Sequence, residues 1–400
     1  MLTSLSLIFL VGLSAAAICK KIRLPRIIGM LVTGIVLGPY VLDLLDPAIL
    51  NASADLRQIA LIIILIKAGL ALDVFDLKKV GRPAILMSFL PACFEIAAFF
   101  LLAPKLLGVT PIEGAVIGAV LGAVSPAVVV PKMVSLMEEK YGTEKSIPQL
   151  ILAGASLDDV FVIVLFYAFT GMAGGEKVSA ARFAEIPVSI VLGILLGIAV
   201  GFVVAFIFEF AHKKNMSIRN SLKVIIILGT AFLIMSVEIW LKNTVPVSGL
   251  LAVMSMACVI QKRCRKEVGT DISAKYGKLW LAAEVMLFVL VGAAVDIRYT
   301  LQAGLTAVAM IFIALLFRSV GVMLCLIGTE LNMKEKLFCV ISYLPKATVQ
   351  AAIGSVPLAM GLPCGKMVLS VAVLSIIITA PLGALGMDIT YRKFLKKENA

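Results

Sequence analysis

Long apolar runs follow one another along almost the whole chain, separated by short charged breaks or breaks that contain Gly and Pro. The hydrocarbon core of a bilayer is about 30 Å thick and needs roughly 20 apolar residues for each crossing helix. Of the 400 residues, 61% are hydrophobic and 15% are charged, far from the balance of a soluble globular domain. The runs are too long for the strands of a membrane barrel. We therefore predict an all-α polytopic membrane protein with about thirteen transmembrane helices.

Lysine and arginine are concentrated in every second loop. The segments "CKKIRLPR", "HKKNMSIRNSLK", "QKRCRKEVGTDISAKYGK" and "YRKFLKKENA" fall on one side of the predicted topology, whereas "DLLDPAILNASAD" falls on the other. Basic loops stay in the cytoplasm, so we predict an external N-terminus, a cytoplasmic C-terminus and a location in the plasma membrane or bacterial inner membrane. The net charge of +12 then reflects topology and anionic lipid headgroups, and no nucleic-acid partner is expected.

Five charged residues lie deep in the predicted spans, where each would cost on the order of 3 kcal/mol or more if it were unpaired. They are three acids and two bases: Glu95, Asp158, Asp159, Arg318 and Lys346. Structural ion pairs can neutralise four of them and leave one carboxylate over. Neighbours on a helix point about 100° apart, so Asp158 and Asp159 cannot both face one partner. Desolvation and mutual repulsion favour protonation of such a pair, which can exchange its proton for a small hard cation that needs oxygen ligands.

Prolines interrupt two of the predicted spans at depth. In "GAVIGAVLGAVSPAVVVPKM" Ser125 and Pro126 are followed by Pro131, and "ISYLPKATVQAAIGSVPLAMG" contains Pro345 and Pro357. Proline removes a backbone donor and disfavours helix just before it. Broken membrane helices line protein cavities, and their half-helix dipoles help to bind ions. The two spans are the fifth and the twelfth of the prediction, so they run in opposite directions and indicate an inverted repeat.

The motifs "GASLDDV", "AVSPAVVVPKM", "KAGLALD" and "LPKATVQAAIG" together resemble those of the monovalent cation/proton antiporter superfamily. The similarity is to its double-aspartate branch, which holds bacterial Na+/H+ antiporters and animal NHA-type sodium/proton exchangers. It covers nearly the whole chain. The combination of "LDD" with "LPKATVQAA" is specific, whereas either motif alone is weak.

The resemblance implies a homodimer of 13-span subunits with two crossing, interrupted helices, in which a mobile core carries the ion by an elevator-type motion. It implies that Asp159 is the principal carrier of the cation and proton, with Asp158 as its partner. Arg318 stands where many relatives have a lysine that pairs with the first aspartate, and Glu95 and Lys346 are expected to face each other. The implied domains are a first dimerisation part at 1–80, core repeat 1 at 81–175, a linking helix at 176–219, a second dimerisation part at 220–298, core repeat 2 at 299–391 and a cytoplasmic tail at 392–400.

The predicted activity is secondary Na+ (or Li+)/H+ antiport by competition of cation and proton for one carboxylate site, with roles in pH homeostasis and sodium tolerance. Ser125, Ser156 and the carbonyls freed around Val124 are candidates to complete the oxygen shell of the cation. The chain contains no nucleotide-binding loop, and its cysteines lack metal-ligand spacing. We therefore expect a transporter and not an enzyme, without cofactor or nucleotide, and driven by an ion gradient.

Other functions remain open at this stage. A K+/H+ antiporter of the same superfamily is the main alternative, because carboxylates discriminate weakly between Na+ and K+. A sodium-coupled organic solute carrier would need more polar residues within the membrane. An intramembrane aspartyl protease would place its two aspartates on separate helices. The charges also bear on the number of protons per cation. Arg318 stays charged and favours one, whereas Glu95 gives the bases a second acid to pair with and frees Asp158 to exchange a proton as well. From the sequence we therefore expect two protons per cation and electrogenic exchange.

Overall fold

The chain is entirely helical in the residues that the structure describes. The computed structural model describes residues 1–398 except 23, 72–73, 176–179, 215–217, 242–244 and 246. Within this part of the chain no strand forms, and Tyr141 and Lys397 make one isolated antiparallel bridge. The prediction of the all-α class is confirmed. The helices are α1 (Leu2–Lys21), α2 (Arg26–Leu37), α3 (Pro47–Asn51), α4 (Ser53–Ala71), α5 (Val74–Met87), α6 (Leu90–Leu107), α7 (Pro111–Gly122), α8 (Pro126–Glu138), α9 (Ile147–Ala173), α10 (Ala180–Lys213), α11 (Asn220–Leu241), α12 (Gly249–Arg263), α13 (Lys266–Ala293), α14 (Ile297–Cys325), α15 (Met333–Ser342), α16 (Thr348–Ile353), α17 (Val356–Ala359) and α18 (Gly365–Phe394).

Seven helices in the described ranges are long and apolar enough to cross a membrane. Shorter apolar helices, of 10–17 residues, cover Arg26–Leu37, Pro111–Gly122, Phe161–Ala173 and Thr348–Ala359. These segments confirm a multi-pass membrane protein, while the number of thirteen spans stays a prediction. The seven long segments are Leu2–Lys21, Gly81–Leu107, Val191–Ala211, Asn220–Leu241, Glu267–Ala293, Gly304–Cys325 and Gly365–Phe394.

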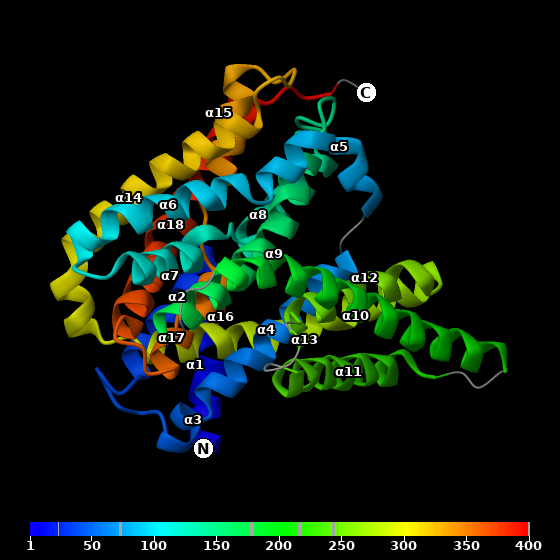
Figure 1. Ribbon diagram of the computed structural model, residues 1–400, viewed down its shortest axis with the longest axis horizontal. Coiled ribbons are helices and arrows are strands. Elements are labelled where there is room, and N and C mark those ends of the chain that lie inside the picture. The colour runs from blue at the N-terminus through cyan, green and yellow to red at the C-terminus, as the bar shows by residue number, and fades with distance from the viewer. Residues whose placement is uncertain are drawn as a thin grey trace. The chain divides into compact units, whose positions relative to one another are not determined.

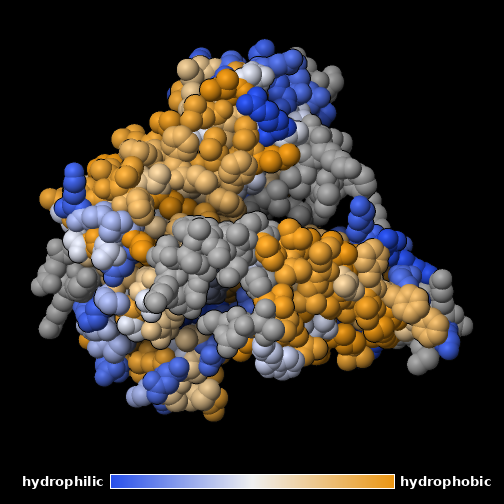
Figure 2. Space-filling model, in the orientation of Figure 1, coloured by the Kyte–Doolittle hydropathy of each residue, from blue (hydrophilic) through white to orange (hydrophobic). Residues whose placement is uncertain are grey.

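Large apolar side chains point outward from several of these helices. Ile239 and Trp240 of α11 are 67% and 70% exposed, and Leu305 and Leu316 of α14 are 86% and 67% exposed. Figure 2 shows large groups of apolar side chains, in orange, on the visible face. Contiguous exposed apolar surface of this kind is rare on soluble monomers. Acyl chains are the environment that suits it.

Contacts within the chain divide it into two compact units. The first comprises residues 1–55, 74–176 and 285–400, and the second comprises 56–73 and 177–284. In the second unit α10 packs along α12, and a Cβ on Gly197 would overlap the carbonyl of Ala252, so glycine allows the two backbones to approach closely. In the first unit α6 lies beside α7 and α14, and α9 packs against α5, α7 and α8 (Figure 1). The division into dimerisation and core domains stays a prediction.

The basic segment "QKRCRKEVGTDISAKYGK", which was expected to be a cytoplasmic loop, is largely helical. It contains the start of α13 at Lys266, so this helix begins within the charged segment. The helix has Glu267 in its first turn, where the negative carboxylate stabilises the positive end of the helix dipole. Asp271 and Lys275 pair one turn apart, with 3.8 Å between Oδ2 and Nζ. Hydropathy alone missed this part of the helix because it is charged.

Both predicted interruptions are present. The first lies between the end of α7 at Gly122 and the start of α8 at Pro126, with Ala123 and Ser125 extended. The second lies between the end of α15 and the start of α16, with Pro345 within it. The chain continues helically through Pro131, so that proline does not contribute to the first break. The half-helix on each side of a break leaves backbone groups free to bind side chains.

Candidate functional site

The two interruptions lie against each other. The Ser125 N–H donates a hydrogen bond to the Pro345 carbonyl over 2.8 Å. Gly383 of α18 makes room for this approach, because a Cβ there would overlap the Pro345 ring. Segments that are 220 residues apart in sequence thus form one crossing in the first unit. The buried charges gather around this crossing.

Arg318 of α14 holds the two interruptions and two carboxylates together. Its side chain is fully buried, with Nη1 2.8 Å from Glu95 Oε2 and Nη2 3.0 Å from Asp158 Oδ2. The same guanidinium donates to the carbonyl of Gly122 in the first break and, from Nε over 2.7 Å, to that of Tyr343 in the second. The five donors of a guanidinium suit this task, and its permanent charge requires compensating carboxylates at this depth. Arg318 is therefore a structural centre of the site.

Lys346 and Glu95 form the expected pair. The Lys346 Nζ lies 2.6 Å from Glu95 Oε2, which is the oxygen that Arg318 also contacts. All three residues are 0% exposed. The Lys346 backbone N–H is held by Thr379 Oγ1 at 2.9 Å, so the start of the α16 half-helix is fixed to α18. Glu95 thus lies between two bases.

Asp159 is the carboxylate without an ionic partner. Arg318 and Lys346 are balanced by Glu95 and Asp158, and no described residue makes an ion pair with Asp159. Asp159 is 7% exposed, and its Oδ1 has no hydrogen-bond partner in the described part of the chain. The three acids and two bases therefore resolve into a neutral cluster of four and one additional acid.

Further buried oxygens near the crossing have no described partner. They include Ser125 Oγ and Asp158 Oδ1, whereas Asp158 Oδ2 accepts hydrogen bonds from the Val124 N–H at 2.8 Å and from Arg318. Buried polar atoms are normally satisfied, so such oxygens are candidate ligands for a cation that prefers oxygen. The side chain of Ser156 lies outside the described residues. The structure thus brings Ser125, Asp158 and Asp159 to one region and says nothing of Ser156.

Two contributors at the crossing were not identified from the sequence. Gln350 of α16 donates from Nε2 to the Ala123 carbonyl over 2.8 Å, and its Oε1 accepts from the Ala347 N–H over 2.7 Å. Tyr343 lies with its ring 5.5 Å from the Arg318 guanidinium and its hydroxyl against Gly154, where a Cβ would overlap it. The sequence offered one signal for Gln350, because it is a polar amide in an apolar run shortly after the predicted break at Pro345. Nothing in the sequence pattern distinguishes Tyr343.

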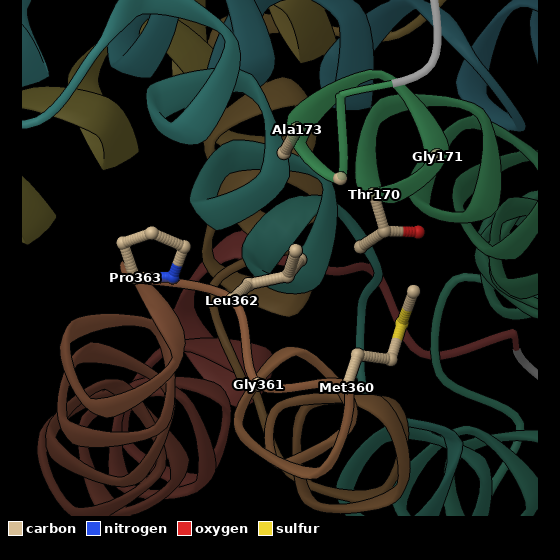
Figure 3. A pocket seen from close by; sticks show the side chains of 8 residues that line it. Thr170, Gly171, Ala173, Met360, Gly361, Leu362 and Pro363 are labelled. Carbon is tan, nitrogen blue, oxygen red and sulfur yellow. The ribbon is translucent and has the colours of Figure 1, made fainter.

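A pocket of about 420 Å³ lies away from the charges, at the far end of α9. Its lining comes from the end of α9 and from the turn between α17 and α18 (Figure 3). Thr170 is its main polar group, and the Thr170 hydroxyl already bonds to the Phe166 carbonyl at 2.8 Å. Thr170 follows Asp159 by eleven residues, a rise of roughly 16 Å along a helix. This pocket is therefore not the charged site.

The fold matches that of a solved membrane protein. It matches the structure of the sodium proton antiporter MjNhaP1 from Methanocaldococcus jannaschii at pH 8 with a TM-score of 0.81. The match covers 98% of each chain at 21% sequence identity, so it concerns the architecture alone.

Sequence comparison then gives the family. Residues 5–391 match the family model described as sodium/hydrogen exchanger, transmembrane. The chain is 35% identical to human sodium/hydrogen exchanger 9B2 over 387 residues, which is 94% of this chain and 70% of that protein. It is 31% identical to human sodium/hydrogen exchanger 9B1 over 420 residues, which is 99% of this chain and 78% of that protein. The chain belongs to the sodium/hydrogen exchanger family.

Proposed function

We propose that the chain is a secondary Na+ (or Li+)/H+ antiporter that exchanges the cation for a proton at the double-aspartate site. The observation that carries this proposal is the unpaired, buried Asp159 beside a cluster whose other charges are balanced. A lone buried carboxylate is costly when it is ionised and without a counterion. A proton or a monovalent cation each relieves that cost, and the two cannot occupy the carboxylate together.

The oxygens that would complete the cation shell are Asp158 Oδ1, Ser125 Oγ and the Val124 carbonyl in the first break. Arg318 and Gln350 already occupy the neighbouring carbonyls of Gly122 and Ala123. Oxygen ligands of this kind suit a hard monovalent cation. Ser156 also remains a candidate by its position in the sequence.

Exchange requires that the site open alternately to the two sides of the membrane. We propose that it does so by an elevator-type motion of a core built from two inverted repeats, in a homodimer with its N-terminus outside and its C-terminus in the cytoplasm. The breaks at 123–125 and 343–347 support the repeat because they occupy matching places. The first break lies between α6 and α9, and the second lies between α14 and α18. The gradient of one ion would then drive the other.

A cation screen on proteoliposomes tests the proposed function. We expect Na+ and Li+ to release protons from vesicles with an acidic interior and a trapped pH-sensitive dye, because either cation displaces the proton at Asp159. Choline, which is too large for a site of buried carboxylates, is the matched control. A response to K+ greater than that to Na+ would favour the K+/H+ alternative. Cation responses equal to those of protein-free vesicles would overturn the proposal.

We also expect the exchange to be electroneutral, one proton for one cation. Arg318 stays charged and contacts both Glu95 and Asp158, so Asp158 is held while Asp159 alone gains and loses a proton. This pairing favours one proton, although the sequence favoured two. Electrogenic exchange would instead be driven by about 2.3 kcal/mol per charge per 100 mV. Solid-supported-membrane recordings after a Na+ jump check this: a robust transient current, or a rate that follows an imposed potential, would contradict it.

A further inference from the structure

Gln350 connects the two interruptions through a neutral side chain. It is 0% exposed and lies in the first turn of α16, just after the second break. Its Oε1 accepts from the Ala347 N–H over 2.7 Å, which fixes the orientation of the amide, and its Nε2 donates to the Ala123 carbonyl over 2.8 Å. A carboxamide serves both contacts because it holds an acceptor and donors on one rigid plane.

The carbonyl that Gln350 binds belongs to the peptide unit that binds Asp158. A peptide unit is planar, and in its trans form the carbonyl of one residue and the N–H of the next point in opposite directions. The Ala123 carbonyl and the Val124 N–H are the two ends of one such unit. That N–H donates to Asp158 Oδ2 over 2.8 Å. A continuous chain of hydrogen bonds therefore runs from Gln350 through the peptide to Asp158.

We infer that Gln350 is a positioning residue for the cation site, which acts on Asp158 through the Ala123–Val124 peptide. This inference rests on the proposed function. Hydrogen bonds in series polarise one another, so donation to the carbonyl strengthens the donation from the N–H. With Oδ2 held by that N–H and by Arg318, the other oxygen, Oδ1, is presented without a described partner. Gln350 thus determines which Asp158 oxygen a cation meets.

The location of this contact explains why a neutral residue is needed. Glu95, Arg318 and Lys346 form a compact charged cluster at the same crossing. A further charge at position 350 would have to be balanced, whereas an amide orients the peptide without changing the sum of charges. Gln350 does not gain or lose a proton, so it sets the geometry of the cation site without entering the exchange stoichiometry.

Gln350→Met tests the inference, because methionine keeps an unbranched chain of similar volume and removes both hydrogen bonds. We expect KM for Na+ to rise about tenfold, equivalent to about 1.4 kcal/mol, which is near the upper end of what one neutral hydrogen bond contributes. The maximal rate at saturating Na+ should stay within about twofold, because the proton carrier Asp159 is unchanged. The same shift should appear in the Na+ concentration that stabilises the purified protein against heat.

Ser355→Ala is the matched control for local packing. Its hydroxyl is buried two residues beyond the end of α16 and has no described partner. The control should keep the wild-type KM. If Gln350→Met and Ser355→Ala both keep that KM while the wild type exchanges Na+ for protons, the inference is wrong and the proposed function stands. If the wild type itself shows no exchange, the proposed function fails first.

Gln350→Glu supplies a readout that a packing role would not move. A protonated carboxyl group retains a donor for the Ala123 carbonyl and an acceptor for the Ala347 N–H, whereas an ionised one repels that carbonyl. We therefore expect the ratio of its KM to the wild-type KM to be near one in acid and to rise with pH. A ratio independent of pH would overturn the inference. This variant decides the question alone if Gln350→Met is not recovered as a folded protein.

Discussion

Asp159→Asn is expected to abolish cation-induced proton release from proteoliposomes while leaving a folded protein. Asparagine has nearly the same shape as aspartate, but it does not bind or release a proton at physiological pH. It also carries no negative charge to attract a cation. Asp159 is the acid of the site without an ion pair in the described structure, so its neutralisation leaves no base uncompensated. Replacement of Asp158 would be different, because it would deprive Arg318 of a partner. The loss should therefore be one of function and not of stability.

Asp388→Asn is the matched control for this variant. Asp388 lies on α18 with 61% of its side chain exposed and pairs with Lys132 at 2.6 Å, outside the crossing. Its neutralisation should leave exchange near the wild-type rate, because surface pairs contribute little. Proton release would be recorded for both variants at equal amounts of reconstituted protein across a pH series. Exchange near the wild-type rate in Asp159→Asn would remove Asp159 from the mechanism.

The sequence predicted those features of the site that carry a large free-energy cost. A charge deep in an apolar run must find a partner, so the sequence predicted that four of the five deep charges are paired. The family resemblance added that Glu95 and Lys346 face each other. Proline disfavours helix just before it, so Pro126 marked a break, whereas Pro131 in the same span did not interrupt α8. The prediction of a remaining carboxylate followed from counting charges, and the observed pairs agree with that count.

The sequence did not predict features that depend on backbone groups and on the third dimension. Arg318 was expected to pair with Asp158, but its bonds to the Gly122 and Tyr343 carbonyls depend on where two breaks meet. Gln350 has no charge whose cost would have drawn attention to it. The early start of α13 was missed for a related reason, because hydropathy reports lipid contact and not the helical state. Such features have no spacing signature in a single sequence.

Removal of either Glu95 or Lys346 alone is expected to destabilise the protein by about 3–5 kcal/mol, because each change leaves an uncompensated buried charge. Glu95→Gln leaves two bases facing Asp158, and Lys346→Met leaves Arg318 shared between two acids. In the double variant Arg318 and Asp158 remain as a balanced pair. The double variant should therefore lose clearly less free energy of unfolding than the two single variants lose together. Thermal unfolding of the wild type, the two single variants and the double variant in detergent gives the coupling free energy of Glu95 and Lys346.

The partly exposed pair of Lys132 and Asp388 serves as the control cycle for this measurement. Its atoms are 2.6 Å apart, as in the buried pair, but the Asp388 side chain is 61% exposed. Water already solvates the Asp388 carboxylate, so its neutralisation should cost less than about 1 kcal/mol and the pair should couple weakly. The Lys132 side chain is 18% exposed and also lies over the Tyr391 ring, so its single change includes the loss of that contact. Two cycles with equal distances and unequal burial thus separate the effect of desolvation from that of contact. Strict additivity in the buried cycle would mean that Glu95 and Lys346 do not interact in the membrane, and the neutral cluster that leaves Asp159 as the remaining acid would then have to be reassigned.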